Sequence, residues 1–280
     1  MALPKNGGKL AFQVAELLDK AGVPSVLWGW LALALVGSDE GSHEVEFVIP
    51  DNKVDTANKA LSDAGFKQCL EASCVQLLEY RVPEGIKFGT LSEEERARLR
   101  IVMTAWDAHH PVPALHYHVD KSRSDMYPLL SLHKKSSQLW WLPELQLGPP
   151  AEDDRNLAMS NSSRLPTGNG RSGPWTGQYP IKVLLPWAFL EAIILLWCRD
   201  YKRPSNLHQL WHSMLLFFLS HDEEVRYKIQ PQFQEAWGYH RGRLVPPDTN
   251  VWIAMKKLRE SLVATNQLPD IPPNNSGTLR

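Results

Sequence analysis

The sequence has few of the features that mark secreted or zinc-finger proteins. It contains only three cysteines, Cys69, Cys74 and Cys198, which are too few for a disulfide framework. Cys69 and Cys74 are spaced too widely for a Cys-x-x-Cys redox motif, and no second pair completes a zinc motif. We therefore expect a reducing, cytoplasmic setting.

No segment has the character of a targeting or membrane-spanning sequence. Residues 1–13 lack an apolar run of signal-peptide length. The most apolar segment, 181–198, is interrupted by Lys182, Pro186 and Glu191, whereas a membrane span needs about 20 apolar residues with few charges. We expect a buried helix there and no membrane partner.

The chain also lacks an excess of charge of either sign. The net charge is −1, so no global field favours nucleic acid. Charged residues make up 22% and apolar residues 43% of the 280 positions, which is ordinary for a globular protein with one large domain or two small ones. Walker, Rossmann, Gly-x-Ser-x-Gly and His-Glu-x-x-His motifs are all absent from the sequence.

The composition along the chain predicts four parts. Residues 1–147 alternate helical and strand patterns and form an α/β domain. Residues 148–179 are rich in Gly, Pro, Ser and Asn, so we expect a flexible linker or loop. Residues 180–268 have helical periodicity, and residues 269–280 form a polar, disordered tail.

Periodicity and stop signals predict the individual elements. Gly22 and Gly65 follow the amphipathic helices at 9–20 and 52–64. Ser92 and Glu95 have capping-box spacing before a short helix at 93–99. The predicted strands are 25–28, 44–49, 75–82, 101–106 and 114–119, and the later helices are 181–198, 206–219, 222–237 with a break at Pro231, and 249–263.

The stretch 25–51 organises the chain, because it reads as strand, tight turn, short helix and strand. In the second strand, Glu44 and Glu46 point to one face and Val45 and Phe47 to the other. Two carboxylates this close repel each other and are costly to bury. Either their face is solvated, or a cation lies between them.

A second polar face is predicted on the strand 114–119. His116, His118 and Asp120 fall on one side of it, and His109 and His110 precede it. Imidazoles suit Zn²⁺ or Mn²⁺ better than Mg²⁺. The alternative is that the histidines are half-buried and hydrogen-bonded to backbone carbonyls, because an isolated His-x-His pair is not specific for metal.

The stretch 25–51 resembles the opening of a nucleotidyltransferase-fold (polymerase-beta-like) domain, and is most similar to uncharacterised fungal proteins of that superfamily. In the family a strand ends in a Gly-Gly or Gly-Ser turn, a helix follows, and the next strand carries Asp-x-Asp. The resemblance covers residues 10–66. This chain departs from the pattern twice, with Gly29-Trp30 at the turn and Glu44-Val45-Glu46 at the acidic motif.

The resemblance implies a fold and a site. The fold is α+β, with a nucleotidyltransferase-like mixed sheet, flanking helices and a helical C-terminal region. Glu44 and Glu46 take the place of the metal-binding aspartates, with Mg²⁺ or Mn²⁺ as the cofactor. A later neighbouring strand normally supplies a third carboxylate, for which Asp120 is the candidate. His116 and His118 would complete a mixed metal site.

The resemblance also places a nucleotide at Gly29 and Trp30. A glycine turn lets backbone N–H groups approach a triphosphate closely. Trp30 would either stack on the base or block the pocket, and the alternative is a plain strand-to-helix turn with a buried indole and no ligand.

Two functions follow from the resemblance. One is metal-dependent transfer of a nucleoside monophosphate from a nucleoside triphosphate to a hydroxyl acceptor of unknown identity. The other is a catalytically degenerate protein that keeps the fold as a binding or scaffold module. They differ in whether Glu44, Glu46 and a third ligand converge on one metal.

Overall fold

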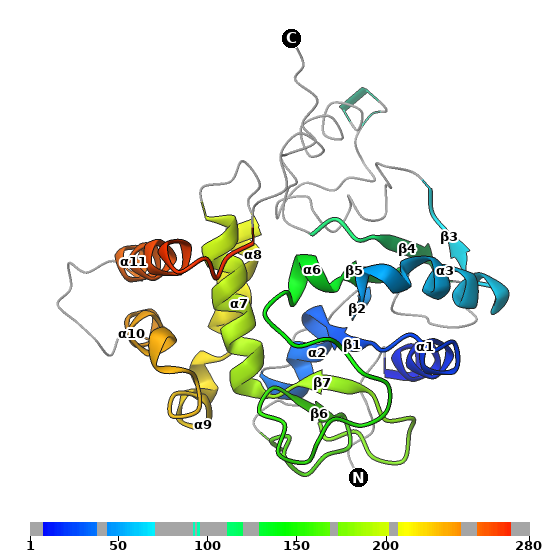
Figure 1. Cartoon of the computed structure of the whole chain (residues 1–280), viewed down its shortest axis with the longest axis horizontal. Coiled ribbons are helices and arrows are strands. Elements are labelled where there is room, and N and C mark those ends of the chain that lie inside the picture. Colours follow the sequence, from blue (N-terminus) through cyan, green and yellow to red (C-terminus); the bar gives the residue numbers. More distant parts are fainter. Residues whose placement is uncertain are drawn as a thin grey trace.

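A computed structural model describes residues 8–37, 44–70, 92, 94–95, 111–119, 129–168, 173–201, 207–241 and 251–269. In this part of the chain a mixed sheet lies beside a helical C-terminal region (Figure 1). The elements in chain order are α1 (Gly8–Lys20), β1 (Val26–Trp28), α2 (Gly29–Val36), β2 (Glu44–Ile49), the 3-10 turn η1 (Asp51–Lys53), α3 (Val54–Asp63), β3 (Lys67–Gln68), β4 (Leu115–His118), β5 (Leu129–Lys134), α6 (Lys135–Gln138), β6 (Leu157–Met159), β7 (Lys182–Leu184), α7 (Pro186–Asp200), α8 (Leu207–Leu216), the 3-10 turn η3 (Leu219–His221), α9 (Asp222–Val225), α10 (Pro231–His240) and α11 (Val251–Ala264).

The larger sheet has five strands in the order β1-β2-β5-β4-β3. β2 and β5 run parallel, and the other neighbours are antiparallel. Trp28 pairs with Glu46, so the strands predicted at 25–28 and 44–49 are antiparallel neighbours. The α+β class, the helices expected at 9–20 and 52–64 and the strand expected at 114–119 are also confirmed.

Strand β5 was not predicted, although it lies between β2 and β4 at the centre of the sheet. Its sequence alternates, because Leu130 and Leu132 point to one face and Ser131 and His133 to the other. All four side chains are buried. The strand that adjoins β2 on this side is therefore β5, and β4 is one strand further away.

Both helix stops behave as predicted. Gly22 has φ +71° and Gly65 has φ +83°, in the left-handed region where glycine is favoured. Ser92 Oγ accepts a hydrogen bond from Glu95 N, and Glu95 Oε2 accepts one from Ser92 N, which confirms the capping box. Most of the helix that it opens, and the strands expected at 75–82 and 101–106, lie outside the described residues.

The segment 148–179, for which we expected a flexible linker or loop, includes one short strand. It contains β6, which pairs with β7, and Trp175 N donates to Ser160 O at 2.7 Å. Ala158, Leu165 and Trp175 are buried in the main hydrophobic core. Scattered apolar residues without a period can still be fixed by tertiary contacts, and composition alone does not reveal them. The mobility expected for this segment remains a prediction.

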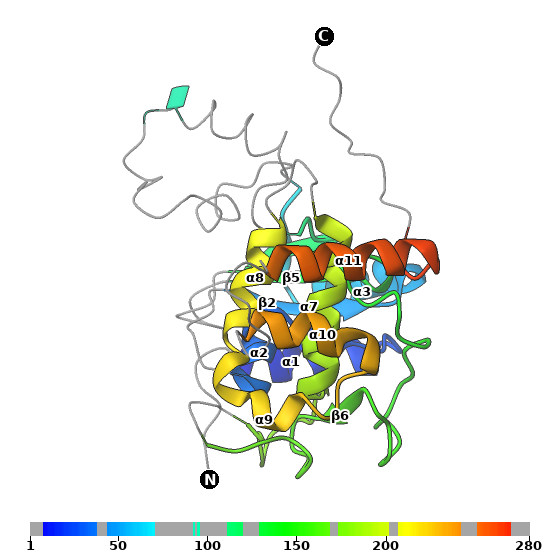
Figure 2. The same cartoon turned by 90° about the vertical axis from the view of Figure 1, so that its left-hand side faces the viewer.

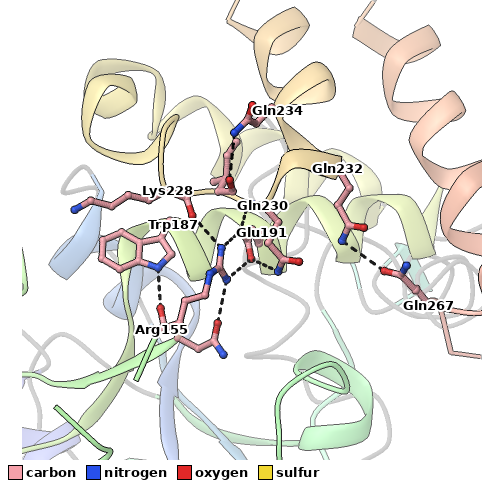
Figure 3. Close-up of polar contacts among 10 residues, drawn as sticks. Arg155, Trp187, Glu191, Lys228, Gln230, Gln232, Gln234 and Gln267 are labelled. Atoms are coloured by element: carbon pink, nitrogen blue, oxygen red, sulfur yellow. Dashed lines mark hydrogen bonds and ion pairs between the residues drawn. The ribbon is translucent and has the colours of Figure 1, made fainter. Parts of the chain in front are cut away.

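A polar network also holds this segment to the helical region (Figure 3). The Arg155 guanidinium donates to both carboxylate oxygens of Glu191 on α7, at 2.6 and 3.1 Å. Gln230, just before α10, donates to the same carboxylate through its backbone and side-chain nitrogens. Hydrogen bonding to Glu191 raises the pKa of Arg155, so the guanidinium stays protonated. Glu191 is fully buried, and such a carboxylate needs these partners.

Helix α7 is the centre of the C-terminal region. It lies between the sheet and helices α10 and α11, as the two views in Figures 1 and 2 show. The helix predicted from residue 181 begins only at Pro186, since Lys182–Leu184 is a strand. Proline at the first helical position is well tolerated, and Pro231 begins α10 in the same way. Among the described helices, none combines the length and apolarity that crossing a bilayer requires.

Candidate functional site

The acidic pair lies on the interior of the molecule. Glu44 is 8% exposed and Glu46 is 4% exposed, so the alternative of two solvated glutamates does not hold. Their partners come from β5. Ser131 Oγ donates to Glu44 Oε1, and His133 Nε2 lies 2.9 Å from Glu46 Oε2. Each carboxylate thus has a hydrogen-bonding neighbour on the adjacent parallel strand.

Gly29 forms the turn from β1 into α2, as predicted, and lies against this pair. Its φ is +68°, and a Cβ built on it would fall 1.7 Å from Glu46 Oε1. Only glycine permits both the backbone conformation and the close approach of the carboxylate. The space that a side chain at Gly29 would fill is therefore occupied by the carboxylate of Glu46.

Trp30 covers the turn. Its ring packs edge-on against Phe217 just after α8, with 5.3 Å between the ring centroids and an interplanar angle of 85°. Between β1, α2 and α8 remains a cavity of about 20 Å³. That volume holds about one water molecule, whereas small-molecule sites usually measure about 300–1,000 Å³. The cavity is lined by Trp28, Gly29, Trp30, Glu46, Pro111, Leu210, Trp211 and Met214.

The predicted histidines lie on the same face of the sheet but form a different group. His116 pairs with Ser131, so β5 separates β4 from the acidic pair. The ligand atoms of His116 and His118 lie within 4.8 Å of each other and of Cys69 Sγ. In the part of the chain that the structure describes, this group includes neither glutamate. Asp120, His109 and His110 lie outside the described residues.

A larger cavity, of about 450 Å³, opens at the carboxyl ends of the parallel strands β2 and β5. Asp51 accepts hydrogen bonds from the backbone N and Oγ of Ser136. Lys135 Nζ lies 3.6 Å from Glu144 Oε1. The half-buried Trp140 ring contributes an aromatic face to the same cavity. The cavity therefore offers charges of both signs and one flat apolar surface.

The Trp140 ring in this cavity is held from two sides. Its Nε1 donates to Gln267 O at 3.0 Å, and the Arg199 guanidinium lies 5.4 Å from its centroid. Arg199 in turn donates to the Asp200 carboxylate and to Ser137 O. Trp211 Nε1 donates to Asp200 as well, at 2.8 Å. One wall of the cavity is thus fixed by the helical region.

Comparisons with protein-family models, with curated proteins and with solved structures found no match for this chain. The site must therefore be interpreted from its own geometry. Sequence reasoning missed Ser131 and His133, although the alternation over 129–134 was a usable signal. It also missed Cys69, which only the pairing of β3 with β4 brings beside the histidines.

Proposed function

We propose that this chain has a nucleotidyltransferase-like fold in which the acidic pair is structural, and that it acts as a binding module rather than as a transferase. The observation that carries the proposal is the identity of the side chains facing the pair. In the nucleotidyltransferase-fold superfamily that the chain resembles, a neighbouring strand supplies a third carboxylate. Here the neighbouring strand β5 supplies Ser131 and His133, which hydrogen-bond Glu44 and Glu46.

The order of elements supports the fold part of the proposal. A strand ends at a glycine turn, a helix follows, and the next strand carries two acids beside that glycine. The first two strands are antiparallel, and a later strand adds in parallel to the second. This arrangement would place a catalytic pair, if one were present, at Gly29.

The surroundings of Glu46 argue against a triphosphate at this place. A divalent cation would compete with His133 for the carboxylate, and a nucleotide would need more space than about 20 Å³. Trp30 would also have to leave Phe217. Magnesium binding sites of phosphoryl-transfer enzymes normally combine carboxylates, several waters and substrate phosphates, all of which need room.

Metal-dependent nucleotidyl transfer is the second candidate. It is favoured by the burial of two carboxylates on one face beside a glycine turn, which is where the resemblance places the metals. For this function the contacts of Ser131 and His133 to the glutamates would have to open when substrate binds.

The cavity of about 450 Å³ at Asp51, Lys135 and Trp140 is the place that we assign to the binding role. Its size is within the range of about 300–1,000 Å³ for small-molecule sites. A flat ring with polar substituents fits a fixed indole next to an ammonium and carboxylates. Saturation-transfer NMR with nucleosides and aromatic amino acids should detect a ligand that the Lys135→Ala variant loses. Absence of any signal in the parent contradicts this placement.

Thermal unfolding with nucleotide tests the choice between the two functions. With saturating Mg²⁺ or Mn²⁺ and each of ATP, GTP, CTP and UTP, the Tm of the parent should shift no more than the Tm of the double variant Glu44→Gln, Glu46→Gln, because the binding role does not use these two glutamates. A ligand present at 100 times its Kd would add about 2.7 kcal/mol to the unfolding free energy. A clear shift that the double variant Glu44→Gln, Glu46→Gln removes would support the transferase and contradict the binding module.

A further inference from the structure

Three metal-ligating side chains gather on one face of the sheet where β3 pairs with β4. Lys67 pairs with His118, and Cys69 N donates to His116 O at 3.0 Å, which continues the antiparallel ladder. Cys69 therefore lies directly across from His116. His118 follows two residues later on β4 and points to the same face. The ligand atoms of all three residues lie within 4.8 Å of one another.

We propose that Cys69, His116 and His118 bind one Zn²⁺ ion, with water in the fourth position. A thiolate and two imidazoles are the ligand set that zinc prefers, whereas Mg²⁺ prefers oxygen ligands. Zinc bonds of about 2.3 Å to sulfur and about 2.0 Å to nitrogen give ligand separations of roughly 3.3–3.5 Å in a tetrahedron. The observed limit of 4.8 Å is close enough for small side-chain rotations to close the site.

The sheet holds these side chains in place before metal arrives. Residues opposite each other in an antiparallel pair have Cβ atoms about 4.5–5.5 Å apart. The His116 and His118 rings lie 6.2 Å apart between centroids. Buried Leu129 on β5, which pairs with His118, packs against Cys69 and provides an apolar base. Two of the ligands thus lie on β4, and Cys69, which directly follows β3, is held beside them by its backbone hydrogen bond to His116.

The exposure of the ligands fits a site that an ion can reach. His118 is exposed and Cys69 is half-buried, while His116 is 9% exposed. On binding, the Cys69 thiol loses its proton to the buffer and the thiolate donates an electron pair to the ion. Cys198 differs, because burial in α7 raises the pKa of its thiol and keeps it in the neutral form.

This site is independent of the binding role proposed for the larger cavity. Its chemistry differs from that of Glu44 and Glu46, and β5 lies between the two groups. A zinc measurement can therefore succeed or fail without deciding whether the chain binds nucleotides.

The test uses the full chain, reduced and stripped with a chelator. Isothermal titration with Zn²⁺ should give one ion per chain, with proton release that depends on the buffer. Changes to outer-shell partners typically lower metal affinity by about 10–100-fold, and loss of a direct ligand should lower it at least as much. We therefore expect Cys69→Ser and His116→Ala each to weaken Zn²⁺ binding by more than about tenfold. Circular dichroism checks that both variants stay folded.

Co²⁺ provides a readout that folding alone does not give. The parent should show a thiolate-to-cobalt charge-transfer band that disappears in Cys69→Ser. The matched controls Cys74→Ser and Cys198→Ser should keep both the band and the Zn²⁺ affinity. No zinc binding at micromolar concentration, or loss of the band in a control and not in Cys69→Ser, overturns the proposal.

Discussion

Two polar groups on one face of the same sheet differ in what surrounds them. On the side of β1, β2 and β5, Glu46 is enclosed by His133 and Gly29, and the cavity that it lines measures only about 20 Å³. At the β3–β4 edge, Cys69 and the two histidines are partly open, with His118 exposed. The enclosed group has the side chains that the resemblance places in a metal site, but little room beside them. The open group has three metal-ligating side chains whose ligand atoms lie within 4.8 Å of one another.

The comparison teaches that partners decide the role of a buried carboxylate. A polar group inside a protein is retained only if hydrogen bonds to other groups compensate its lost hydration. Glu46 obtains that compensation from a neighbouring strand, and Glu191 obtains it from Arg155 and Gln230. In both places the acid joins segments of the fold that are far apart in sequence.

The largest effect should come from closing the space that Glu46 uses. Gly29→Ala adds a Cβ that would overlap the carboxylate, at a residue with positive φ. Backbone strain of about 1–3 kcal/mol and overpacking of about 1–3 kcal/mol should lower the unfolding free energy together, as measured by urea denaturation. Gly22→Ala is the matched control, since its φ is also positive but no atom lies within 4 Å of the added Cβ.

Gly22→Ala should therefore cost only the strain contribution. If the two alanine variants are equally stable, Glu46 does not depend on the open backbone at Gly29, and the enclosed description of this group is wrong.

A smaller effect should appear in the unfolding free energy at low pH, and it should come from His240 in the helical region rather than from the sheet. Burial, followed by the charge of His212, lowers the pKa of His240 to about 4. The unfolded state has the ordinary value of about 6.5, so it binds more protons between pH 6.5 and 4. The stability contributed by neutral His240 is complete above pH 6.5 and is lost as the pH falls towards 4.

Replacing His240 should flatten this dependence. We expect His240→Gln to reduce the slope of unfolding free energy against pH between 6.5 and 4, measured by urea titrations at fixed pH. The variant His133→Gln is the comparison, because it removes a buried histidine whose partner is the carboxylate of Glu46. If His240→Gln leaves the slope unchanged and His133→Gln removes it, the acid sensitivity belongs to the enclosed group.

The smallest effect is expected at the open edge. Without metal, His118→Ala changes an exposed side chain, and such changes stay within about 0.5 kcal/mol. Thermal unfolding of the chelator-treated variant should match the parent. A large loss of stability would show that the edge is a structural contact rather than a metal site.

Much of the fold was predictable because local patterns agree with the tertiary structure. The amphipathic helices end at Gly22 and Gly65, and the alternation from Glu44 to Ile49 gives a strand with the expected faces. Strand β5 was missed although its sequence alternates, and its place between β2 and β4 depends on pairing with residues far away in the chain. That non-local pairing also decides which side chains meet the acids, so the site was less predictable than the fold.

The residues of the site show where the limit lies. The resemblance placed Glu44, Glu46 and Gly29 in one site, and the structure brings Glu46 against Gly29. It did not predict that Ser131 and His133 are their partners, or that Cys69 joins His116 and His118. Burial of the acids could not be foreseen either, because an alternating strand can have one face solvated or both faces covered.

A double-mutant cycle between Glu46 and His133 tests the central claim most directly. The unfolding free energies of the parent, Glu46→Gln, His133→Gln and the double variant are measured by urea denaturation without metal. A structural pair predicts that the single changes destabilise and that the coupling energy is about 1.5–3 kcal/mol, as for hydrogen bonds to charged groups. A coupling near zero, with Glu46→Gln at least as stable as the parent, would mean that Glu46 is kept for a cation and would contradict the account.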